Sequence, residues 1–172
     1  MLAASSTRMN LPRVKVMDEL HLEMPARECN IALVAAEFNH FIVQQLVDGA
    51  VDALNRNGVS GQNISLAWVP GAFELPLAAD VLASSGKHDA VIALGAVIRG
   101  GTPHFDYVAG ECSRGLASVG LKHGLPVIFG VLTTDTVDQA LERAGSGTGN
   151  KGFDTAIGAL QMISLMDRLR AE

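Results

Sequence analysis

The sequence predicts an α/β protein, a three-layer αβα sandwich in which four parallel strands form one sheet. Two observations lead to this prediction. Four short apolar segments, of which Ala90–Ile98 is typical of a strand buried on both faces, alternate with longer segments whose apolar residues recur at helical spacing. The chain has 172 residues, of which 48% are hydrophobic and only 18% are charged, so it can form a single domain with a sizeable core.

The first half of the predicted pattern follows directly from the residues. Ile31–Ala36 is a short apolar run and is expected to be a strand, and Phe41–Asn57 has the apolar period of a helix. Gly58 is placed where a helix commonly ends in a left-handed residue. The next strand is expected over Ile64–Val69, and the next helix over Leu75–Ser84.

The second half repeats this alternation. The apolar run Ala90–Ile98 is expected to be the central strand, followed by a helix over Phe105–His123 and a strand over Val127–Leu132. A helix over Thr136–Ala144 begins with capping-box spacing, and the last helix is expected over Gly152–Leu169.

Repeated strand and helix units imply a parallel sheet with helices on both faces, and the flavodoxin-like strand order 2-1-3-4 is the natural arrangement. Val14–Met17 is a candidate for an additional edge strand at the N-terminus. Residues 1–13 are expected to be a flexible extension, and residues 14–172 a single domain.

Charge and motif content exclude several classes of function. The formal net charge of −5 does not suit a nucleic acid or an anionic membrane, because both require a basic face. The chain has no apolar run long enough to span a membrane, no signal-peptide pattern and no metal-ligand spacing. Its two cysteines, Cys29 and Cys112, are expected to be free thiols. We therefore expect a cytoplasmic protein that binds small molecules.

The predicted fold brings four polar segments to one edge of the sheet, because each follows a parallel strand and ligands bind at this edge. These segments offer the Phe38 ring for stacking, the carboxylate of Glu74, and the glycine pair at 100 and 101, with Arg99 or another cation adding charge. His104 can exchange a proton near neutral pH. The set suits a planar polar heterocycle together with an anion.

Each of these residues also has a purely structural explanation. Phe38 can cap the core, Glu74 can interact with a helix dipole, the glycines can serve turn geometry, and His104 can stand at a helix start. Their coincidence at one edge favours the functional interpretation.

Five segments of the sequence resemble one known family. They are Val69-Pro-Gly-Ala-Phe-Glu-Leu-Pro76, Gly95-Ala-Val-Ile-Arg-Gly-Gly-Thr-Pro-His-Phe-Asp-Tyr-Val108, Phe129-Gly-Val-Leu-Thr-Thr134, Glu142-Arg-Ala-Gly145 and Gly149-Asn-Lys-Gly152. Together they resemble 6,7-dimethyl-8-ribityllumazine synthase, over about Asn30 to Leu165. The resemblance implies a transferase of riboflavin biosynthesis that condenses 5-amino-6-(D-ribitylamino)uracil with 3,4-dihydroxy-2-butanone 4-phosphate and uses no cofactor and no metal.

The resemblance also implies a role for individual residues. It assigns the pyrimidine and ribityl chain to Phe38, Ala72, Phe73, Glu74, Ala96, Val97, Ile98 and Phe129. It assigns the butanone phosphate to Gly101, Thr102 and Arg143. It makes His104 the proton donor and acceptor, with Arg143 and Lys151 as further catalytic residues and Asp154 in a supporting role.

The resemblance further implies a homo-oligomer built from pentamers, with active sites between adjacent subunits, and in some members an icosahedral assembly that associates with riboflavin synthase. Three alternatives remain open at this point: a non-catalytic flavin- or nucleotide-binding module, a shell protein that has lost its catalysis, and an archaeal-type riboflavin synthase.

Overall fold

The four strands form one parallel sheet in the order β2-β1-β3-β4, as the sequence predicts. The protein is described by a computed structural model that covers residues 19–145 and 149–171. The candidate edge strand at Val14–Met17 and the expected extension over residues 1–13 lie outside the described residues.

The strands and helices alternate along the chain, with two 3-10 turns between them. The strands are β1 (Ile31–Ala36), β2 (Ile64–Val69), β3 (Ala90–Ile98) and β4 (Val127–Thr134). The helices are α1 (His40–Arg56), α2 (Leu75–Ser84), α3 (His104–His123), α4 (Val137–Arg143) and α5 (Lys151–Ala171). The 3-10 turns are η1 (Gly61–Asn63) and η2 (Ala72–Glu74).

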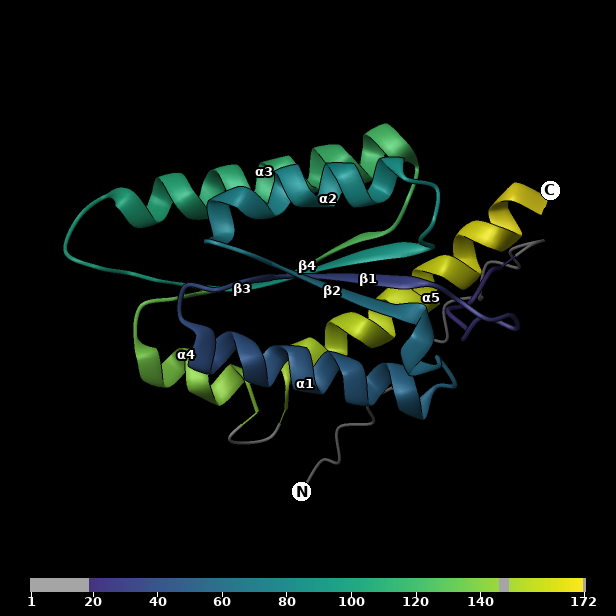
Figure 1. The fold of residues 1–172 in the computed structure, drawn as a ribbon, viewed down its shortest axis with the longest axis horizontal. Coiled ribbons are helices and arrows are strands. Elements are labelled where there is room, and N and C mark those ends of the chain that lie inside the picture. The colour runs from purple at the N-terminus through teal and green to yellow at the C-terminus, as the bar shows by residue number, and fades with distance from the viewer. Residues whose placement is uncertain (1–18, 146–148, 172) are drawn as a thin grey trace, which may run out of the picture.

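The sheet is the middle of three layers (Figure 1). Helices α2 and α3 cover one face, and α1, α4 and α5 cover the other. Alternate residues of the central strands supply the two cores: Ile31 and Leu33 pack with α1 and α5, whereas Ala32 and Val34 pack with α2 and α3. Strand β3 is buried along most of its length, which explains its unbroken apolar sequence.

The structure confirms residues that the sequence predicts to end or begin helices. Gly58 and Gly124 follow α1 and α3 with φ angles of 84° and 58°, the left-handed conformation that glycine adopts without strain. The Thr136 side chain accepts a hydrogen bond from the N–H of Gln139 and begins α4.

Two element boundaries differ from the prediction in a way that affects the site. Strand β4 continues to Thr134, two residues beyond the predicted end, because Thr133 and Thr134 pair with Val97 and Ile98 of β3. Helix α3 begins at His104 and not at Phe105, so the histidine is part of the first helical turn.

The chain reverses its direction of winding at β1. It passes from β1 to the edge strand β2 on one side and then crosses to β3 on the other side. The carboxyl ends of β1 and β3 therefore border a crevice at the topological switch point, where open α/β sheets bind their ligands.

Candidate functional site

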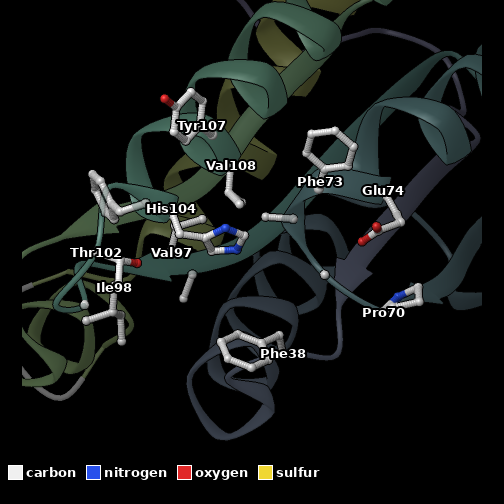
Figure 2. Close-up of a pocket in the computed structure, with 15 residues that line it drawn as sticks. Phe38, Pro70, Phe73, Glu74, Val97, Ile98, Thr102, His104, Tyr107 and Val108 are labelled. Carbon is white, nitrogen blue, oxygen red and sulfur yellow. The ribbon is translucent and has the colours of Figure 1, made fainter.

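A cavity of about 690 Å³ opens at this crevice. It is lined by the segments that follow β1, β2 and β3 and by the first turns of α3. Figure 2 shows the imidazole of His104 and the carboxylate of Glu74 both directed into the cavity, with Phe38 on one side and Phe73 on the other. The cavity thus combines aromatic faces, an acid and a titratable ring.

Phe38 is an exposed ring on a fixed backbone. Its N–H donates to the Pro70 carbonyl at 3.1 Å, and its side chain is 72% exposed. The following residue, Asn39, has a φ of 61° and donates from Nδ2 to the Ala96 carbonyl at 2.8 Å. Asparagine tolerates this conformation better than most residues, and the bond ties the loop to β3. The ring therefore does not cap the core and is free to stack on a ligand.

The loop after β2 presents Phe73 and Glu74 from a short 3-10 turn. The Glu74 N–H donates to the Gly71 carbonyl at 3.2 Å, and this bond closes the turn. A Cβ placed on Gly71 would lie 3.3 Å from Oε2 of Glu74, so glycine leaves room for the carboxylate. Phe73 is 56% exposed, whereas Ala72 is buried in the core between the sheet and helices α2 and α3.

The end of β3 offers main-chain hydrogen-bonding groups. The ladder to β1 stops at Leu94, while the ladder to β4 continues to Ile98. Main-chain groups alternate between the two sides of a parallel strand. The Ala96 carbonyl faces Asn39, and the Arg99 N–H donates to Thr134 of β4. Ala96 and Ile98 accordingly direct their main-chain groups toward the cavity side, and Val97 directs its own toward β4.

The glycine pair after β3 is not required by the geometry of the turn. Neither Gly100 nor Gly101 has a positive φ, and a Cβ on either would meet no atom within 4 Å. The missing side chains leave the main chain of this turn accessible. Gly100 and Thr102 line the cavity, and Gly101 lies between them.

Arg99 does not supply charge to the cavity, contrary to the expectation from sequence. Its Nε donates to Asp135 at 3.0 Å, its Nη atoms approach Asp106 at 3.4 and 3.5 Å, and its guanidinium stacks 4.2 Å from the centre of the Phe105 ring. The hydrogen bond that Arg99 donates to Asp135, and after it those that it donates to Asp106, raise the pKa of Arg99. This cluster borders a second hollow of about 510 Å³.

Several predicted residues lie away from the cavity of their own chain. Phe129 lines the second hollow. Arg143 donates from Nη1 to the Gln139 carbonyl at 3.1 Å at the end of α4. Lys151 and Asp154 pair with each other at 3.1 Å in the first turn of α5.

The structure also adds lining residues that the prediction lacks. They are Phe105, Tyr107 and Val108, all from α3. Tyr107 and Val108 could have been predicted from helical spacing, because the third and fourth residues after His104 lie on the same face of the helix as His104.

Two other features, a metal-binding cluster and a membrane-spanning helix, are absent from the described part of the chain. Residues 19–145 and 149–171 contain no group of three or more His, Cys, Asp or Glu side chains that could hold a metal ion. None of the helices in these ranges is long and apolar enough to cross a membrane. Cys29 and Cys112 are buried free thiols, as expected.

These features define a flavodoxin-like α/β protein with a ligand-sized pocket at the switch point of its sheet. Residues 28–167 match the family model of 6,7-dimethyl-8-ribityllumazine synthase, and the chain belongs to this family. It is 56% identical over 147 residues to the 6,7-dimethyl-8-ribityllumazine synthase of Edwardsiella ictaluri (strain 93-146), an alignment that covers 85% of this chain and 94% of the relative.

Proposed function

We propose that this chain is a transferase that condenses 5-amino-6-(D-ribitylamino)uracil with 3,4-dihydroxy-2-butanone 4-phosphate to give 6,7-dimethyl-8-ribityllumazine, the penultimate step of riboflavin biosynthesis. The observation that carries the proposal is one cavity in which an exposed ring, a carboxylate and a histidine converge, in a chain of this family. No cofactor takes part in the proposed reaction.

The pyrimidine half of the cavity suits the aminouracil. Phe38 stacks on its ring, and the main-chain groups around Ala72, Phe73, Ala96 and Ile98 hydrogen-bond its polar edge. Val97 lines the cavity through its side chain, because its main-chain groups face β4. The carboxylate of Glu74 accepts hydrogen bonds from the ribityl hydroxyls.

His104 serves as the proton donor and acceptor. The aminouracil amine attacks the ketone carbonyl, and loss of water gives an imine. The phosphate is then eliminated, and ring closure with loss of a second water gives the lumazine. Protons must leave nitrogen and reach the departing oxygens, which is general acid and base work for an imidazole directed into the cavity.

The phosphate half of the site points to a neighbouring subunit. Gly101 and Thr102 offer main-chain and hydroxyl donors, but the described residues that line the cavity include neither Lys nor Arg. A phosphate anion is usually bound with a cation. We propose that Arg143 of an adjacent subunit supplies it, with Lys151, its partner Asp154 and Phe129 close by.

We further propose a homo-oligomer built from pentamers with active sites between adjacent subunits, as the resemblance to the family implies, with an icosahedral shell associated with riboflavin synthase as its largest form. We also propose a cytoplasmic location. Light scattering on the purified protein measures the mass of the assembly, and a monomer that is fully active would contradict the shared site.

The experiment that tests the function mixes purified protein with both substrates and follows lumazine absorbance and fluorescence against a blank without enzyme. Acceleration that requires both substrates supports the proposal. Turnover of lumazine alone would instead indicate a riboflavin synthase, and an inactive oligomer would indicate a binding module or a shell protein.

A further inference from the structure

The proposed proton-transfer residue has no side-chain anchor of its own. No hydrogen bond or ion pair joins the His104 ring to another of the residues that the structure describes. His104 stands at the start of α3, after a turn in which both glycines border open space. The direction of its ring therefore depends on how the first turn of α3 is held.

Arg99 connects the first turn of α3 to the end of β4. Its main-chain N–H donates to the Thr134 carbonyl at 2.9 Å, which fixes residue 99 to the end of β4. Its guanidinium is anchored on Asp135 at 3.0 Å and reaches Asp106 of α3 at 3.4 Å. The sheet end and the helix start are thus joined by one side chain.

The same guanidinium stacks on the residue next to the histidine. It lies 4.2 Å from the centre of the Phe105 ring, within the range of a cation–π contact. Phe105 lines both the main cavity and the second hollow, so it forms the wall between them. The two residues that follow His104 are therefore both in contact with Arg99.

We propose that Arg99 is a positioning residue of the condensation, which acts by fixing the direction in which His104 enters the cavity. The proposal rests on the proposed function, in which His104 transfers the protons. Arginine suits this position because its planar guanidinium can bind two carboxylates and stack on an aromatic ring at the same time, whereas the lysine ammonium offers only a point charge.

The test compares Arg99→Met and Arg99→Lys with a matched control, Arg56→Met. Arg56 also pairs with a carboxylate, Asp52 at 2.9 Å, and also lies over a ring, that of Phe153 at 6.0 Å, but it is remote from the cavity. We expect Arg99→Met to lower kcat by about 10- to 100-fold, because small misplacements of a catalytic group are costly. The lysine variant should recover part of this loss, and Arg56→Met should match the wild type.

A double-mutant cycle separates positioning from a general structural effect. If Arg99 acts through His104, adding Arg99→Met to His104→Ala should lower kcat by less than about threefold. Equal losses in the two backgrounds, or a kcat within about twofold of wild type for Arg99→Met alone, would overturn the proposal. Light scattering confirms that each variant assembles, and if the methionine variant does not, the lysine variant decides by the same cycle.

A measurement without substrate keeps this proposal distinct from the proposed function. Hydrogen exchange at the imidazole C2 position, followed by mass spectrometry, reports the environment of each histidine. We expect Arg99→Met to raise the exchange rate at His104 and to leave that of His123 unchanged. An unchanged rate at His104 would refute the positioning role even if the wild type proves inactive as a synthase.

Discussion

Replacing Phe38 by alanine should weaken binding of the aminouracil while leaving the fold almost intact. The ring is 72% exposed, so less than a third of it contributes to burial. Full burial of a phenylalanine is worth roughly 1.5–3 kcal/mol, and the fold should therefore lose only about 0.5–1 kcal/mol.

The loss in binding should be larger than the loss in stability. Stacking of a base on an aromatic side chain is worth about 1–3 kcal/mol, which corresponds to a roughly 5- to 150-fold rise in Kd. Titration calorimetry with 5-amino-6-(D-ribitylamino)uracil alone measures this change without the chemical step. Thermal unfolding of the same sample measures the effect on stability.

Phe41→Ala provides the matched control. Phe41 is 56% exposed and lies in the first turn of α1, but it does not line the cavity. Its removal should leave the Kd within about twofold of wild type, the range expected for a residue without contact to the ligand. A Kd for Phe38→Ala that is unchanged, or that rises no more than the control, would refute the stacking role.

Two further predictions concern other parts of the molecule. His104→Ala should lower kcat by about 100- to 10,000-fold, the usual range for a general acid or base, with the assembly intact by light scattering; unchanged turnover would remove His104 from the mechanism. The hydrogen bond from His123, and after it that from Lys122, lowers the pKa of Asp80 below its ordinary value of 3.8. The charged carboxylate therefore stabilises the fold above that pH, and this stabilisation is lost as the pH falls below it. Asp80→Asn should therefore unfold at a lower temperature than wild type at pH 7, and the gap should close toward pH 3; a gap that does not depend on pH would contradict this assignment.

The sequence predicts the sheet well because its signals are local and agree with one another. An unbroken apolar run rich in Val and Ile, such as Ala90–Ile98, is typical of a strand covered on both faces. Left-handed glycines such as Gly58 mark helix ends where apolar periodicity also stops. The strand order then follows from the few topologies that connect four parallel strands with helices on both faces.

The ion-pair partners of the charged side chains could not be predicted from the sequence. Arg99 follows directly after a buried strand and next to a glycine pair, which favoured a role in anion binding. In the fold, β4 extends to Thr134 and brings Asp135 beside Arg99, while α3 brings Asp106 from the other side. Both contacts depend on where two elements end, and element boundaries are what periodicity defines least well.

A site shared between subunits makes a prediction that a site within one chain does not. In the proposed assembly, His104 of one subunit meets Arg143 of its neighbour, so His104→Ala and Arg143→Ala damage opposite sides of each site. Subunits of the two variants that are unfolded together and reassembled should form intact sites at about one quarter of their interfaces, because each side is intact in half of the subunits of a ring.

The control is each variant reassembled alone, which should remain as impaired as before treatment. Recovery of close to a quarter of wild-type activity in the mixture would place the two residues on different chains. If the mixture is no more active than its components, although wild-type protein treated in the same way regains its activity, then Arg143 does not complete the cavity of a neighbour. In that case Arg143 would not be the cation that binds the phosphate, and neutralising it would have little effect on use of the phosphorylated substrate.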